Sequence, residues 1–175
     1  MDGIFAGVRK GDAALAAVLT ALGALLMVMN ITGDEAGTRI DSRSWLMVPV
    51  FAAATLPILW RRRGMVAVIA VTAAALAVHV LAFGWVVRCG AGLPLAFALA
   101  YGAGRLSRGG WSFAGLAATI GIQFLVLVRD SAAGLDIIPV TAAIAIAAWG
   151  AGVWLRRRAL RARSAGAPAT AAAHV

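Results

Sequence analysis

Three consecutive arginines, Arg61 to Arg63, follow one long apolar run with no spacer and precede a second one. The first run ends at Trp60 and the second begins at Met65. A soluble core has no place for such a junction, but a membrane has one. Tryptophan favours the level of the lipid head groups, and arginines beside a span mark its cytoplasmic side. The junction therefore predicts two membrane-spanning helices joined by a short cytoplasmic turn.

The composition also indicates an integral membrane protein. Of the 175 residues, 62% are hydrophobic and 13% are charged, whereas soluble domains are about 45–50% apolar and about 25% charged. The net charge of +9 would suit a nucleic-acid-binding protein, but the basic residues gather at the ends of apolar runs, where they set membrane topology. We therefore expect no nucleic-acid partner. With Cys89 as the single cysteine, the chain has no internal disulfide.

The apolar runs predict an all-α, polytopic transmembrane helix bundle. A residue 1–12 segment precedes the bundle, and a basic, then disordered, tail follows it over residues 156–175. The expected spans cover about residues 13–31, 45–60, 65–87, 91–104, 111–128 and 137–155. The fourth run is short for a crossing and contains Pro94, so a tilted helix and a re-entrant segment both stay open for it.

The distribution of basic residues predicts the orientation of the bundle. With six spans and Arg61–Arg63 in the cytoplasm, the N-terminus and the C-terminus both lie inside a bacterial cytoplasmic membrane. A five-span bundle would move the strongest basic cluster, Arg156–Arg163, to the outside, so the positive-inside rule favours six spans. The basic residues expected outside are Arg39, Arg43, Arg88 and Arg129.

Two groups of side chains are expected to hold the bundle at the membrane surface. Arginines at the cytoplasmic ends of spans set the topology and contact lipid head groups, and tryptophans at span ends anchor the interface. The arginines are Arg61, Arg62, Arg63, Arg156, Arg157, Arg158, Arg161 and Arg163. The tryptophans are Trp45, Trp60, Trp111 and Trp154.

Two stretches of the chain share a pattern with a known family. Residues 56–68 combine a Leu-Pro span end, an arginine cluster and an Ala/Val-rich span, and residues 149–163 carry a last span that runs into an arginine-rich helix. The pattern resembles the N-terminal multi-span membrane domain of actinobacterial sensor histidine kinases, over about residues 11–163. The resemblance implies a sensory or regulatory module that signals through its last span.

The sequence also departs from that family. There the arginine-rich exit continues into a helix with a phosphoacceptor histidine and then an ATP-binding domain, whereas here the only histidines are His79 and His174 and no nucleotide-binding box is present. No cluster of acids, histidines or metal ligands suggests catalysis either. We expect no enzyme activity, cofactor or metal. The expected partners are membrane lipids, a second copy of the chain, and a histidine kinase or other signalling protein. A small transporter or channel, and an inactive kinase remnant, are the alternatives.

Polar side chains within spans are functional candidates because their burial in lipid is costly. His79, in the third span, suits either an interhelical hydrogen bond or a titrating sensory group. Gln123, in the fifth span, is expected to bond to a neighbouring helix, with a ligand role as the alternative. Asn30 lies near the outer end of the first span, where interfacial solvation explains it. Asp130 and Asp136 flank a short outer loop and are interpreted as solvated acids.

Overall fold

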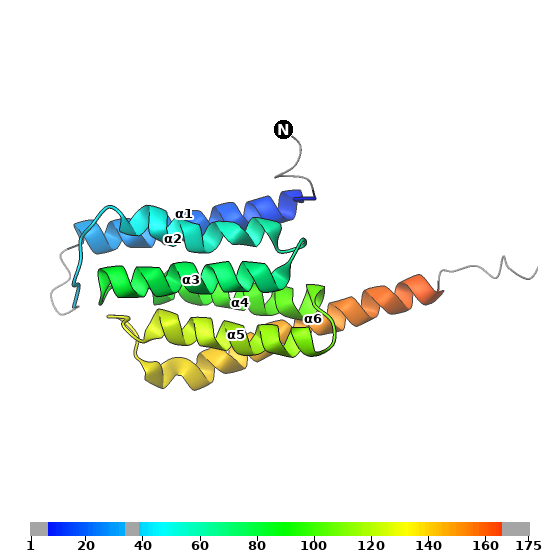
Figure 1. The fold of residues 1–175 in the computed structure, drawn as a ribbon. Coiled ribbons are helices and arrows are strands. Elements are labelled where there is room, and N and C mark those ends of the chain that lie inside the picture. Colours follow the sequence, from blue (N-terminus) through cyan, green and yellow to red (C-terminus); the bar gives the residue numbers. More distant parts are fainter. Residues whose placement is uncertain (1–6, 34–38, 166–175) are drawn as a thin grey trace, which may run out of the picture.

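The computed structural model describes residues 7–33 and 39–165, and within them the chain forms six α-helices and no strand. The predicted all-α class is confirmed. The helices run alternately up and down, so both ends of the described chain lie at the same end of the bundle (Figure 1). The elements are α1 (Lys10–Thr32), α2 (Met47–Thr55), the 3₁₀ helix η1 (Leu56–Trp60), α3 (Met65–Phe83), α4 (Cys89–Leu106), α5 (Gly110–Leu127), the 3₁₀ helix η2 (Leu135–Ile137) and α6 (Ile138–Ala165).

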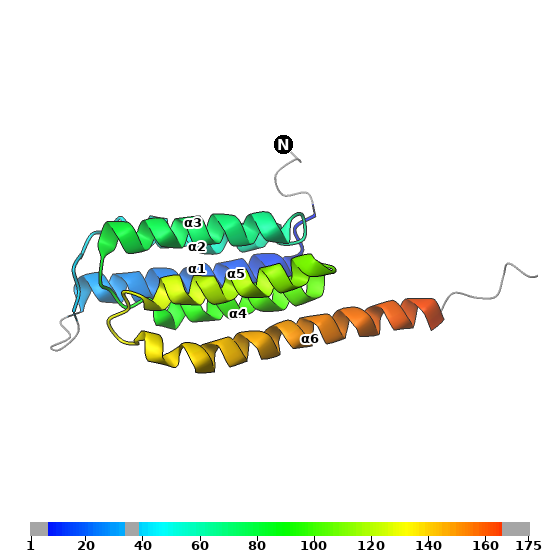
Figure 2. The same ribbon diagram turned by 60° about the horizontal axis from the view of Figure 1, so that its bottom comes forward.

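The two ends of the bundle differ in character and are named accordingly. The arginine end is where α1, α3 and α5 begin, and it carries the turn after η1. The loop end is the opposite end, where residues 84–88 join α3 to α4 and residues 128–134 lead from α5 towards α6. The last part of α6, residues 156–165, extends past the other helices at the arginine end and is called the exit helix (Figure 2).

Four helices, α1, α3, α5 and α6, are long and apolar enough to cross a membrane. Their outward faces carry large apolar side chains that no other part of the described chain covers. Such a surface suits lipid and would be an aggregation liability in water. Among these exposed side chains are Val18, Leu25, Val78, Leu81, Phe113 and Ile146.

Helix α4 is largely enclosed by the other helices. It contacts α1, α3, α5 and α6, and glycines on its surface let these helices approach closely. A Cβ added at Gly92 would lie 2.6 Å from a methyl group of Val126, and one at Gly104 would collide with the backbone carbonyl of Trp149. α4 is one continuous helix despite Pro94, and its crossing of a membrane stays a prediction.

Two predicted spans are shorter than expected, and each has a local cause. The predicted second span consists of α2 and η1: Pro57 has no N–H to donate to the carbonyl of Ala53, and the α-helix gives way there to a 3₁₀ helix. The third span ends at Phe83 and not at residue 87, because Gly84 takes a φ of +62° and turns the chain out of the helix.

Helix α6 is longer than the predicted sixth span. It continues without a break through the basic residues to Ala165, because arginine and alanine are both good helix formers. Near the arginine end the Trp149 indole N–H donates to the Ser112 hydroxyl at 2.9 Å, and this hydroxyl donates to the Ala103 carbonyl at 3.1 Å. These bonds join α6, α5 and α4. The disordered part of the tail was predicted to begin at Ser164, but Ser164 and Ala165 still belong to α6; residues 166–175 lie outside the described residues.

The contact between α4 and α6 predicts opposite effects for two glycines of α6. A Cβ at Gly152 would collide with the Tyr101 carbonyl, whereas one at Gly150 would meet nothing within 4 Å. We expect Gly152→Ala to lower the free energy of unfolding by about 1–3 kcal/mol through overpacking. Gly150→Ala should leave it unchanged or raise it by up to about 1 kcal/mol through helix propensity. Thermal unfolding in detergent, followed by tryptophan fluorescence, measures both, and equal melting temperatures would contradict the packing argument.

Candidate functional site

The segment between α3 and α4 organises the loop end. After Gly84 the chain is extended, and it bonds to two other connections. The Trp85 N–H donates to the Asp41 carboxylate at 3.1 Å, and the Asp41 N–H donates to the Trp85 carbonyl at 2.8 Å. The bond from Trp85 and the nearby Arg39 guanidinium hold the pKa of Asp41 below its usual range. On the other side, Val86 pairs with the segment around Asp130 as a short parallel bridge.

Asn30, near the end of α1, bonds to the same segment. Its side-chain amide donates to the Val87 carbonyl at 2.8 Å, and its oxygen accepts from the Val87 N–H at 3.0 Å. Only 3% of Asn30 is exposed. The interpretation of Asn30 as a solvated interfacial residue is therefore wrong, because its amide takes the place of a neighbouring strand.

Arg88 has the largest fully buried side chain of the described residues. Its Nε donates to His79 Nδ1 at 3.0 Å, and its two terminal nitrogens donate to the carbonyls of Arg129 at 2.8 Å and Gly84 at 2.6 Å. Burial lowers the pKa of Arg88 to about 10, and the negative charge of Asp130 opposes that shift. The guanidinium is therefore still charged at neutral pH. Sequence reasoning placed Arg88 among the basic residues outside the membrane and missed this role.

Asp130 complements Arg88 from the connection after α5. One carboxylate oxygen accepts from the backbone N–H groups of Arg88 and Cys89, both at 2.6 Å, and so caps the start of α4. The other oxygen accepts from Ala132 and Ala133, both at 2.9 Å. Because only 3% of Asp130 is exposed, its interpretation as a solvated acid is wrong. Asp136, by contrast, is exposed.

His79 lies wholly inside the bundle, on α3, where its ring is packed between aromatic side chains. Its centroid lies 5.5 Å from that of Phe51 and 4.8 Å from that of Phe83, both in edge-on geometry. Since Nδ1 accepts from Arg88, the proton of the neutral ring is on Nε2. That atom is buried and has no hydrogen-bond partner of good geometry among the described residues. The hydrogen bond that His79 makes is with Arg88, in the connection that follows α3.

Gln123, on α5, is buried with neither side-chain nitrogen nor side-chain oxygen hydrogen-bonded to any described residue. The expected bond to a neighbouring helix is therefore not formed. We call the contacts of Asn30, His79, Arg88 and Asp130 the loop-end network. Residues 84–88 connect His79 and Asn30 within this network, and Gln123 is not part of it.

The turn after η1, which carries Arg61 to Arg63, also makes a contact that sequence reasoning missed. Asp12, in the first turn of α1, is 1% exposed. Its two carboxylate oxygens accept from Arg61 Nε at 2.7 Å and from Arg62 Nε at 2.6 Å. The available signal was an acid in the first turn of a helix, where the helix dipole favours it. Two of the arginines assigned to lipid head groups thus also fasten η1 to α1.

The other predicted surface residues lie at the ends of helices. Trp45, Trp111 and Trp154 are exposed, and Trp60 packs partly against the core. The Trp154 ring lies 5.4 Å from the Arg158 guanidinium carbon, and Arg156 donates to the Ser107 carbonyl. Their expected contacts with lipid stay predictions.

We searched for metal-ligand clusters and compared the chain with known proteins. Within residues 7–33 and 39–165, no three His, Cys, Asp or Glu side chains come together as metal ligands would. No family model, curated protein or solved structure matches the chain. The resemblance to histidine-kinase membrane domains therefore stays a prediction from the sequence.

The loop-end network predicts unequal effects for two acids in one connection. We expect Asp130→Asn to destabilise the protein by about 1.5–3 kcal/mol, because an amide nitrogen cannot accept the hydrogen bonds that the charged oxygen takes. Asp136→Asn removes the same charge from an exposed position and should change the free energy of unfolding by less than about 0.5 kcal/mol. Thermal unfolding in detergent compares the two, and similar losses would refute the capping role.

Proposed function

We propose that this chain is an integral membrane protein with six spans and both termini in the cytoplasm, and that it acts as a sensory or regulatory module without catalysis of its own. The continuity of α6 is the observation that carries the proposal. This helix starts shortly after Asp130, packs on α4 and runs unbroken into the exit helix. A change in the loop-end network that moves α4 can therefore reach the exit helix through the contact between α4 and α6.

The distribution of charge between the ends supports the proposed orientation. The arginine end carries basic residues from the start of α1, the turn after η1, the end of α4 and the exit helix. At the loop end, Arg88 is buried beside Asp130 and Arg39 pairs with Asp41 at 2.9 Å, while Arg43 and Arg129 are exposed. The loop end thus carries fewer basic residues than the arginine end. Under the positive-inside rule, the arginine end faces the cytoplasm.

The shortest proposed span, formed by α2 and η1, can still cross a bilayer. The nine residues of α2 and the five of η1 cover about 24 Å at roughly 1.5 and 2.0 Å per residue, against about 30 Å of hydrocarbon. A bilayer can thin locally around a short helix at modest cost. The exposed Trp45 ring at one end and Trp60 at the other lie where interfacial anchors are needed.

The resemblance to histidine-kinase membrane domains supplies the proposed partner. In that family the arginine-rich exit passes the signal to a kinase core. Here we propose that the exit helix docks onto a histidine kinase or another signalling protein in the same membrane. The alternative, a small transporter or channel, is favoured by one observation, the buried and unpartnered amide of Gln123, because intramembrane polar groups of this kind often mark substrate paths.

The proposed topology is tested with single cysteines on a Cys89→Ala background. Ala132 is exposed at the loop end, and Ala162 is exposed on the exit helix. An impermeant maleimide should label Ala132→Cys in intact cells and Ala162→Cys only after permeabilisation. The reverse pattern would mean the opposite orientation, and labelling of both from one side would mean that α6 does not cross.

The proposed partner is tested by co-purification from the native membrane through a C-terminal tag. We expect a histidine kinase or response regulator to be retained. Arg157→Gln/Arg158→Gln/Arg161→Gln should reduce its retention about tenfold, because three exposed charges contribute roughly 0.5 kcal/mol each. Arg39→Gln/Arg43→Gln/Arg129→Gln, which removes three exposed charges at the loop end, serves as the charge-matched control. Recovery of further copies of this chain alone would contradict the proposal and favour the transporter.

A further inference from the structure

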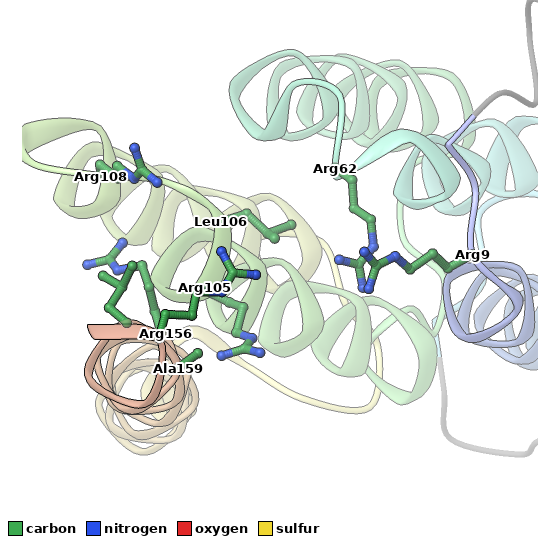
Figure 3. A pocket seen from close by; sticks show the side chains of 9 residues that line it. Arg9, Arg62, Arg105, Leu106, Arg108, Arg156 and Ala159 are labelled. Atoms are coloured by element: carbon green, nitrogen blue, oxygen red, sulfur yellow. The ribbon is translucent and has the colours of Figure 1, made fainter. Parts of the chain in front are cut away.

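Six arginines surround one hollow at the arginine end, and they come from parts of the chain that are far apart in sequence (Figure 3). The hollow has a volume of about 280 Å³. Its walls come from the residue before α1, the turn after η1, the end of α4 with the following loop, and the exit helix. The arginines are Arg9, Arg62, Arg105, Arg108, Arg156 and Arg163.

The positive charge of this hollow is not balanced within the described residues. No acidic side chain lines it. The described acid at this end, Asp12, already has both carboxylate oxygens bonded to Arg61 and Arg62. The other described acids, Asp41, Asp130 and Asp136, belong to connections at the loop end. So many guanidiniums around one space repel one another unless an anion lies between them.

The chemistry of the walls indicates which anion fits. One guanidinium group can donate two parallel hydrogen bonds to two oxygens of the same phosphate. Leu106 and Leu160 also line the hollow, and they give a phosphate-bearing ligand an apolar side. A second hollow of about 170 Å³ adjoins the first, shares Arg62 and Arg105 with it, and extends to Tyr101 between α4 and η1. Inorganic phosphate has no apolar part that could contact these leucines, whereas a phospholipid has one.

We propose that this hollow binds the phosphate head group of an anionic phospholipid from the surrounding leaflet. Basic pockets between membrane helices on the cytoplasmic side are suited to such head groups. A bound phosphate joins Arg9 and Arg62 to Arg156 and Arg163, and so holds the exit helix against the start of α1 and the turn after η1. Regulation of the exit helix by the lipid rests on the proposed function, but the binding itself does not.

The test uses the full chain, stripped of lipid in a neutral detergent and titrated with phosphatidylglycerol or phosphatidylcholine, with bound lipid counted by native mass spectrometry. We expect one phosphatidylglycerol to bind with clear preference. Arg105→Gln/Arg108→Gln should weaken it about 25-fold, which is about fivefold per arginine. Arg157→Gln/Arg158→Gln, the same charge change beside the hollow, should keep the wild-type affinity within about twofold.

Other outcomes overturn the proposal. Equal losses of phosphatidylglycerol affinity in both double variants would mean that a diffuse basic surface binds the lipid. Equal binding of phosphatidylcholine would mean that the hollow does not select for the charge of the head group. Displacement of phosphatidylglycerol by inorganic pyrophosphate at equal concentration would assign the hollow to soluble phosphates. If Arg105→Gln/Arg108→Gln does not fold, Arg108→Gln alone, in an exposed loop, carries the test with a fivefold loss. Intact lipid binding with no co-purified partner would count against the proposed function only.

Discussion

A buried cation, the guanidinium of Arg88, is the group on which the loop end of this bundle depends. In an apolar surrounding, each hydrogen-bonding group left without a partner is costly. Arg88 donates to the ring of His79 and to backbone carbonyls at the ends of α3 and α5. Asp130 provides the complementary acceptors for the start of α4. One opposite-charge pair of residues thus closes the ends of three helices, and neither member can be removed without leaving the other's groups unsatisfied.

The arginine end follows the opposite principle, with one buried acid among many bases. Asp12 fastens α1 to the turn after η1 through Arg61 and Arg62, while most of the other arginines there are exposed. The loop end is therefore held by a closed network, and the arginine end by one ion-pair cluster and an open basic surface. The two ends therefore differ physically: the loop end depends on local packing and hydrogen bonds, and the arginine end carries unbalanced positive charge.

The number and type of helices follow from the apolar runs, but the contacts at their ends do not. Asn30 and Val87 are 57 positions apart, and the Arg88 N–H and the Asp130 carboxylate are 42 apart, so no local pattern joins them. The same holds for Asp12, which looks like a helix-start acid until the fold brings the arginines to it. The close contacts at the glycines of α4 were also missed, because the sequence of this segment does not show which helices pack against it.

The position of α4 decides how a signal could move through this molecule. It is covered by α1, α3, α5 and α6, its start is capped by Asp130, and glycine contacts hold it against α6 with no room for a side chain. Packed interfaces of this kind have discrete arrangements and do not deform gradually. Within the proposed function, a stimulus at the loop end therefore acts on α4 and α6 as a pair. The exit helix then responds by a shift of the pair against α1 and η1, where the arginines meet.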